Sequence, residues 1–338
     1  MRERILYLDI IRIVACFMII AMHAPIPNSG LGSYVLSTDS LLTIPGVALF
    51  IMVSGALILP VNMPTGQFLK KRFTKITIPT VFWTTFYFIV APFTETVNQG
   101  IGLNSFLSIP FSSQFNGVLW FMYMLAGLYL VAPVLTGWLR GANRKEIEFY
   151  LCLWGITMCY PLIRNWIVVN EGHSGILYYM SGYVGYFILG YYLKNYITIM
   201  AMWKSLLLMV IPLMTAIILK ISHIEIDFYD LFGYLSIFVV MMAVALFVAF
   251  KRLDVVYNED SKFHQYLVTI SNCCFGIYLV HIFVMRSILW NSTVLRNFDG
   301  ILQILVVSIL TFVLSFMFVR IISYLPFAEF IIGYKNKK

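Results

Sequence analysis

The stretch LDIIRIVACFMIIAMHAP, residues 8–25, decides the fold, because it is apolar enough to lie in a bilayer and yet carries Asp9, Arg12 and His23. A charged side chain near the centre of a membrane helix costs about 2.5 to 3.5 kcal/mol on the insertion scale. Three such groups on one short helix therefore need a reason. At 100° per residue they fall, together with Cys16, within about 60° of one another. This stripe is expected to face one cavity or one neighbouring helix.

Two interpretations of the stripe stay open at this stage. Asp9 and Arg12, three residues apart, can neutralise each other, while His23 ends the helix at the interface before Pro25. Alternatively, ionisable groups inside a membrane line a functional pathway, which we favour for the pair Arg12 and His23. Their spacing of eleven residues corresponds to about 16 Å, roughly half the hydrocarbon thickness. Arg12 is then expected in the cytoplasmic half and His23 near the outer end.

The composition indicates an integral membrane protein. Of the 338 residues, 61% are hydrophobic and 11% are charged, against roughly 25% charged in soluble domains. The net charge of +8 comes with no long basic run or soluble domain, so it does not predict nucleic-acid binding. The five cysteines lie in apolar segments without the paired spacing of a metal site or a disulfide framework. We expect them to be small core residues, and we predict no metal.

Hydropathy predicts an all-α, polytopic helix bundle with about ten transmembrane helices. The expected spans are residues 5–25, 40–59, 76–94, 117–138, 149–168, 176–193, 204–220, 230–250, 266–289 and 301–325. Ten spans assign 17 of the 23 basic residues to one side, which predicts that both termini are cytoplasmic. No linker, low-complexity tract or internal repeat divides the chain, so residues 1–338 are expected to form one domain.

A second polar stripe lies in TISNCCFGIYLVHIF, residues 269–283. Ser271, Cys274, Tyr278 and His281 fall within about 80° on a helix. A lone histidine in such a place is more often buried and hydrogen-bonded than directly involved in chemistry, and we assign His281 a supporting role.

The basic run FLKKRFTKITIP, residues 68–79, lies between the second and third expected spans. Such a cluster commonly sets topology and contacts anionic lipid. However, Arg72 and Lys75 are three residues apart, where they can share a helix face and bind a phosphorylated ligand. Spacing alone does not decide between these two interpretations.

Taken together, several stretches resemble the acyltransferase type 3 family of multispan membrane proteins, especially its short O-acetyltransferases such as that of enterobacterial common antigen. The matching stretches appear in the expected order over most of the chain. They are LDIIRIVACFMIIAMH, ALFIMVSGALI, FLKKRFTKI, LWFMYMLAGLYLVAPVL, GYFILGYYL and ISNCCFGIYLVH.

This resemblance implies an acyl-CoA donor on the cytoplasmic side and a glycan or lipid-linked sugar as acceptor, in a bacterial cytoplasmic membrane. Arg12 and His23 match the family's Arg-x10-His motif and are the expected catalytic residues. Arg72 and Lys75 stand at its Arg-x-x-Arg position, where with Lys71 they are expected to bind the CoA part of acetyl-CoA. Because Lys75 replaces an arginine, it keeps the charge but loses bidentate phosphate binding.

The expected chemistry moves an acyl group from a thioester to a hydroxyl. Histidine suits the removal of the hydroxyl proton near pH 7, so His23 is expected to act as general base or to carry the acyl group itself. Asp9 is expected to orient Arg12. Trp120, Tyr123 and Asn116 form either a sugar-stacking surface or, as we favour, an interfacial aromatic belt.

The main alternative is an exporter or flippase for a polysaccharide or lipid-linked sugar, with the polar stripes lining its route. The sequence shows no phosphate-binding G-x-x-x-x-G-K-[ST] loop, no G-x-S-x-G elbow and no H-E-x-x-H zinc motif. ATP-driven transport and serine hydrolysis are therefore disfavoured.

Overall fold

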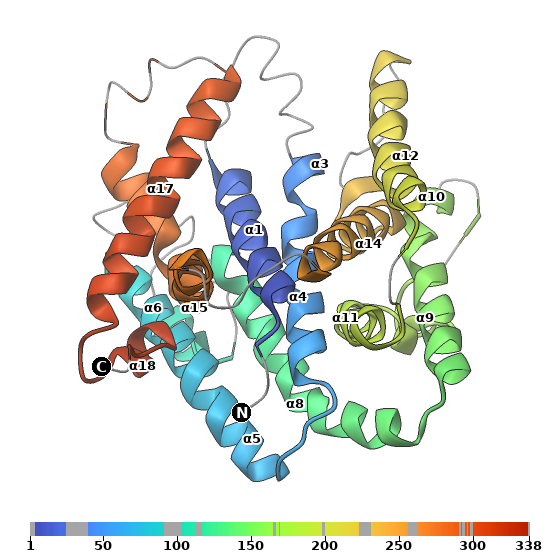
Figure 1. The fold of residues 1–338 in the computed structure, drawn as a ribbon, viewed down its shortest axis with the longest axis horizontal. Helices are drawn as coiled ribbons and strands as arrows, with labels where there is room; N and C mark the ends of the chain where they lie inside the picture. The colour runs from blue at the N-terminus through green and yellow to red at the C-terminus, as the bar shows by residue number, and fades with distance from the viewer. Residues whose placement is uncertain are drawn as a thin grey trace. The chain divides into compact units, whose positions relative to one another are not determined.

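The computed structural model is all-helical over the part of the chain that it describes (Figure 1). It describes residues 4–24, 40–90, 103–111, 117–164, 167–168, 170–197, 200–222, 231–255, 262–290, 292, 295, 297 and 300–336. No strand occurs among these residues, which confirms the predicted all-α class.

The described elements comprise α-helices, two π-helices (η1 and η6) and three 3₁₀-helices (η3, η4 and η5). The first half contains α1 (Leu6–His23), α3 (Ser40–Thr43), α4 (Pro45–Ile58), α5 (Thr65–Arg72), η1 (Phe73–Thr77), α6 (Ile78–Val90), α7 (Leu103–Ser108), η3 (Gly117–Leu119), α8 (Trp120–Gly141), α9 (Arg144–Met158) and α10 (Tyr160–Ile163). The second half contains η4 (Tyr178–Met180), α11 (Val184–Tyr196), α12 (Met202–Ile221), α14 (Ile237–Lys251), η5 (Arg252–Val255), α15 (Lys262–Ile282), η6 (Phe283–Leu289), α17 (Gly300–Ile322) and α18 (Ala328–Ile332).

Each of the ten segments expected to span the membrane contains a helix. Five helical stretches are long and apolar enough to cross a bilayer. These are Thr65–Val90, Gly117–Gly141, Met202–Leu219, Lys262–Leu289 and Leu302–Ile322. The other expected segments form α1, α4, α9, α11 and α14, so a total of ten spans stays a prediction.

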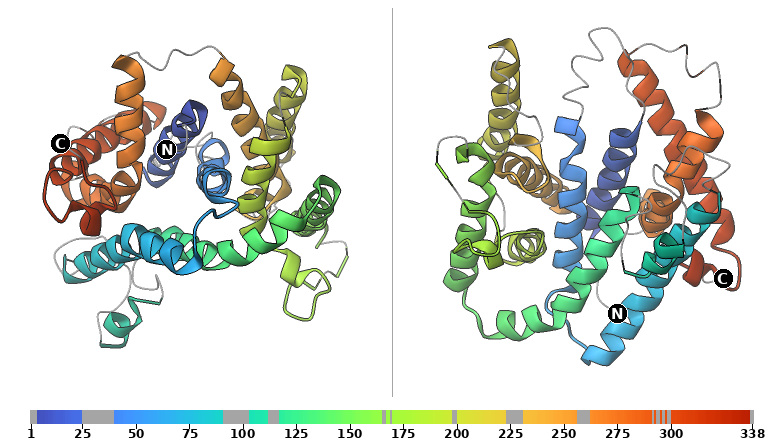
Figure 2. Two further views of the ribbon diagram at one scale, coloured as in Figure 1. Left: turned by 60° about the horizontal axis from the view of Figure 1, so that its bottom comes forward. Right: turned by 180° about the vertical axis from the view of Figure 1, so that it is seen from behind.

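The basic run is helical throughout, so the third expected span begins earlier in the chain than residue 76. The helix expected from residue 76 begins at Thr65 and runs on through η1 into α6, as the cyan ribbon of Figure 2 shows. Lysine and arginine are good helix formers, so the basic run is compatible with a continuous helix. Lys70, Lys71 and Arg72 lie where α5 continues into η1.

The chain divides into two compact units, each assembled from three separated segments. Unit 1 consists of Met1–Met18, Thr38–Val61 and Ala132–His264. Unit 2 consists of Ile19–Ser37, Asn62–Val131 and Gln265–Lys338. The boundary falls within α1, which contributes residues to both units. One domain over residues 1–338 stays a prediction.

In unit 1, α4 and α11 approach each other closely enough for their backbones to touch (Figure 1). A Cβ atom on Gly55 of α4 would lie 1.8 Å from the Phe187 carbonyl oxygen. A Cβ atom on Gly190 of α11 would lie 1.9 Å from the Met52 carbonyl oxygen. Small residues permit such contacts between apolar helices, which associate largely by van der Waals packing. Gly55 of ALFIMVSGALI and Gly190 of GYFILGYYL therefore lie at the α4–α11 contact.

Basic side chains in unit 1 cap backbone carbonyls at helix ends. Arg140 donates from Nη2 to the Val61 oxygen at 2.9 Å, and Lys194 donates from Nζ to the Ala56 oxygen at 2.9 Å. Lys251 donates to three carbonyls at the end of α11 at 2.6 to 2.9 Å. Cations stabilise these otherwise unsatisfied groups. Basic residues assigned to one side of the membrane thus lie at neighbouring helix ends.

We predict that Gly55→Ala and Gly190→Ala each destabilise the protein. The added methyl group meets backbone that no rotamer change can move, so a loss of about 3 kcal/mol is expected. Thermal unfolding of the detergent-purified protein measures it.

The matched control is Gly137→Ala in α8, where an added Cβ has nothing within 4 Å. This helical substitution should be neutral or stabilising by about 0.5 to 1 kcal/mol. Equal losses for all three variants would contradict the role of close α4–α11 packing.

Candidate functional site

The first turns of α1 hold a three-residue charge cluster in unit 1. The Asp9 carboxylate, whose side chain is 7% exposed, lies 2.6 Å from Arg4 Nε and 3.6 Å from Arg12 Nη1. Neutralisation of Asp9 by Arg12 is thus present, but Arg4 is the closer partner. Two guanidinium groups thus share the Asp9 carboxylate.

Helix α1 is continuous from Leu6 to His23, so Arg12 and His23 are fixed along one axis. Arg12 belongs to unit 1 and His23 to unit 2. Any proximity of Arg12 to Arg72 or Lys75, which are in unit 2, stays a prediction.

His23, the last residue of the first stripe, meets the second stripe within unit 2. The rings of His23 and His281 have centroids 5.4 Å apart and planes inclined by 33°. The whole second stripe is buried, with Ser271, Cys274, Tyr278 and His281 at most 3% exposed. This stripe therefore faces the protein interior.

The tautomer of His281 follows from its contact with the backbone. Its Nδ1 lies 2.5 Å from the Tyr278 carbonyl oxygen, which can only accept a hydrogen bond. Nδ1 therefore carries the proton, and Nε2 presents a lone pair. Nε2 is buried and has no hydrogen-bond partner among the described residues. Buried polar atoms are normally hydrogen-bonded, so this acceptor marks a place where a hydrogen-bond donor can bind.

Arg286 is a site residue that the sequence analysis missed. It lies in η6 of unit 2, and its charge is close enough to act on both His23 and His281. Residues five apart differ by about 140° on an α-helix, so periodicity separates Arg286 from His281. The wider turn of a π-helix reduces that angle. The available signal was the arginine itself, five residues beyond His281 in an apolar segment.

Tyr87 of α6 supports the junction between α15 and η6. Its hydroxyl donates to the Leu279 carbonyl at 2.9 Å and accepts from the Phe283 amide at 3.3 Å. These two groups form one rung of an uninterrupted α-helix. The buried hydroxyl therefore bridges the helix where its hydrogen-bond register changes.

The structure does not bring Arg72 and Lys75 to one pocket. Arg72 lies over the rings of Phe68 and Tyr129, 5.5 and 5.4 Å from their centroids, and lines a cavity of about 650 Å³. Lys75 lines another cavity, of about 980 Å³, and lies 3.4 Å from Glu329.

The separation has a physical cause in η1. The Ile78 amide bonds to the Phe73 carbonyl, five residues earlier, so the backbone turns less per residue here than in an α-helix. Arg72 and Lys75 are then further than about 60° apart around the axis. Lys71, on the exposed surface of α5, lines neither of the two cavities.

The predicted aromatic group is partly described. A chain of ring contacts leads from Trp120 to His281. The ring centroids are 6.3 Å apart for Trp120 and Phe121, 5.7 Å for Phe121 and Tyr278, and 5.4 Å for Tyr278 and His281. Tyr123 donates to the Ile109 carbonyl at 2.6 Å and lines the Arg72 cavity.

Asn116 lies outside the described residues. Within the described part of the chain, no group of three or more His, Cys, Asp or Glu side chains is placed to hold a metal ion.

Comparison with known proteins gives a family for most of the chain. A family model described as an acyltransferase domain, that of acyltransferase 3, matches residues 5–320. No curated protein and no solved structure matches the chain.

We predict that Tyr87→Phe destabilises the protein by about 1 to 3 kcal/mol, because two buried backbone groups lose their shared partner. Thermal unfolding measures the loss, and hydrogen exchange should accelerate at the Phe283 amide. Tyr266→Phe, on the exposed surface of α15, is the control and should change neither. An unchanged exchange rate in Tyr87→Phe would show that the hydroxyl does not support this junction.

Proposed function

Because the chain belongs to the acyltransferase 3 family and is a membrane O-acyltransferase, we propose that it transfers acetyl from acetyl-CoA to a hydroxyl of a cell-envelope glycan or lipid-linked sugar. The observation that carries the proposal is the contact between the His23 and His281 rings, with the charge of Arg286 close enough to act on both. Transfer of an acyl group from a thioester to an alcohol needs a base and a stabilising cation. The two imidazoles can supply the base, and the guanidinium can supply the cation.

His23 is the proposed general base. Its imidazole takes the proton of the acceptor hydroxyl as the hydroxyl oxygen bonds to the thioester carbonyl carbon. The carbon–sulfur bond then breaks, and the sulfur of CoA leaves with the proton returned by His23. The lone pair on Nε2 of His281 can accept a hydrogen bond from the acceptor or from His23.

Arg286 is the proposed electrostatic partner of this reaction. Negative charge develops on the carbonyl oxygen as the hydroxyl attacks, and a fixed guanidinium stabilises it. Among the described residues, Arg286 forms no salt bridge. Its charge is therefore not neutralised by any described carboxylate.

The proposed topology has ten spans with both termini cytoplasmic, in a bacterial cytoplasmic membrane. Two observations support it. In unit 1, Arg140, Lys194 and Lys251 cap neighbouring helix ends. In unit 2, Lys75 and Lys335 line the same cavity. The chain between two residues on the same side of a membrane crosses it an even number of times, and the proposed topology has eight spans between these two lysines. The donor is proposed to enter from this basic side, with Arg12 along its path.

We predict that His23→Ala lowers transfer by about 10² to 10⁴-fold while leaving thermal unfolding unchanged, because it removes the base and not the helix. The assay uses purified protein, acetyl-labelled acetyl-CoA and a bacterial lipid-linked glycan extract, and follows both CoA release and label in glycan. His173→Ala, at an exposed loop position, is the control and should retain full activity.

Three outcomes would contradict parts of the proposal. Full activity of His23→Ala would exclude this residue as base. Label trapped on His23 would indicate an acyl carrier in place of a base. Movement of unmodified glycan across vesicles without acyl-CoA, with no CoA release, would favour an exporter or flippase.

A further inference from the structure

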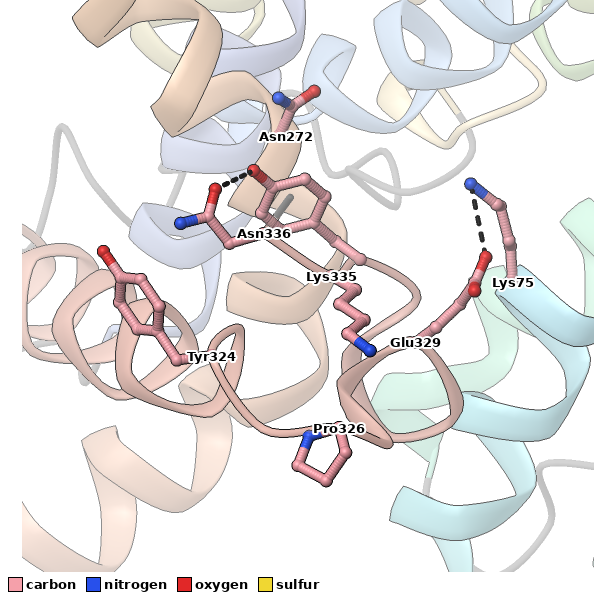
Figure 3. A pocket seen from close by; sticks show the side chains of 8 residues that line it. Lys75, Asn272, Tyr324, Pro326, Glu329, Lys335 and Asn336 are labelled. Atoms are coloured by element: carbon pink, nitrogen blue, oxygen red, sulfur yellow. Dashed lines mark hydrogen bonds and ion pairs between the residues drawn. The ribbon is translucent and has the colours of Figure 1, made fainter. Parts of the chain in front are cut away.

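Unit 2 contains a polar cavity of about 980 Å³ at the end of α17 and the segment that follows it (Figure 3). Its lining consists of Lys75, Asn272, Tyr324, Pro326, Glu329, Tyr334, Lys335 and Asn336. Six of these eight residues follow position 320, where the family match ends. The family match therefore assigns no role to most of this cavity.

The segment after α17 is held against α6 and η1 by specific contacts. Gly333 has φ of +66°, and a Cβ atom there would lie 2.4 Å from the Lys75 carbonyl oxygen. The Trp83 indole N–H donates to the Ile331 carbonyl at 2.9 Å. The backbone N–H of Asn336 donates to the Ser323 carbonyl at 2.9 Å. Glycine is suited to this left-handed turn. The wall of the cavity is thus a built part of unit 2.

The charges of the cavity suit an anion. Lys75 and Lys335 supply two ammonium groups against the single carboxylate of Glu329. Figure 3 shows Lys75 and Glu329 facing each other, with a nitrogen–oxygen distance of 3.4 Å. Their side chains are 39% and 38% exposed, and ion pairs this exposed contribute little stability. A phosphate can therefore displace the Glu329 carboxylate at small cost.

The remaining lining suits an aromatic base with hydrogen-bonding edges. Asn272 and Asn336 carry amides, and Tyr324 and Tyr334 carry phenol rings. Arg320 lies 5.0 Å from the centroid of the Tyr324 ring, so a third cation is close. The volume lies within the range of about 300 to 1,000 Å³ of small-ligand sites.

We propose that this cavity binds the phosphorylated nucleotide end of the acyl donor, and that Glu329 is an internal counter-ion which leaves Lys75 when a phosphate arrives. This inference rests on the proposed acetyl-CoA-dependent function. It assigns nucleotide contacts to Lys335, Tyr334 and Asn336. Anionic lipid headgroups share the phosphate chemistry but lack the base that the amides and phenol rings favour.

The test measures binding of adenosine 3′,5′-bisphosphate to the full chain in nanodiscs of phosphatidylcholine. Lys335→Gln should weaken binding about tenfold, because it removes one charge-assisted hydrogen bond. Glu329→Gln should tighten binding about threefold, because the competing carboxylate is gone. A folding defect cannot produce this gain. Lys145→Gln, at an exposed position on α9, is the control and should bind like the unaltered protein.

The outcomes separate this inference from the proposed function. If acetyl transfer occurs but both variants bind the probe like the control, the cavity assignment fails and the function stands. If the probe binds as expected but no transfer is found with any acceptor, the function fails and the nucleotide site stands. If nanodiscs with phosphatidylglycerol abolish the Lys335-dependent binding, the cavity is a lipid site and the inference is overturned.

Discussion

Hydrogen bonding of the backbone within hydrocarbon is the constraint on which the described helices depend. Water is absent there, so every amide and carbonyl must find its partner inside the chain. A membrane helix can then re-aim its side chains only by a change that keeps these bonds. Both η1 and η6 are such changes, since each continues a helix with bonds between residues five apart. At η6 the hydroxyl of Tyr87 supplies additional bonds to the backbone.

The two π-helices act in opposite ways on pairs of polar residues. In η6 the wider turn reduces the angle around the helix axis between Arg286 and His281, whose ring lies against that of His23. In η1 it turns Lys75 away from Arg72, so one cation stacks on aromatic rings and the other faces Glu329. π-Helical turns are frequent at functional sites, and here both lie next to cavities or ionisable clusters.

Features that follow from regular α-helical periodicity could be predicted from the sequence. The all-α class and the burial of His281 agree with the structure, and the family agrees with the family model. Neither Arg286 nor the C-terminal cavity was predicted, because the periodicity of the sequence signals neither of them. A π-turn has no periodic pattern of its own, and the contact between η1 and α18 joins residues more than 250 positions apart. The positions of Gly55 and Gly190 in apolar segments can be read from the sequence, but only the structure shows that both lie at the contact between α4 and α11.

The presence of η1 also affects how sequence comparisons should be made along this chain. An alignment pairs residues by their identity, whereas a ligand contacts side chains that point in a given direction. Where one helix has an extra residue within a turn, residues paired without a gap point in different directions. Deletion of a single codon between Phe73 and Thr77 would restore ordinary winding and leave the later side chains of α6 close to their present directions, because five residues of a π-turn cover about the same rotation as four residues of an α-helix. An alignment of this chain with a homologue that lacks the extra residue would, without a gap here, pair side chains that point about 100° apart in α6.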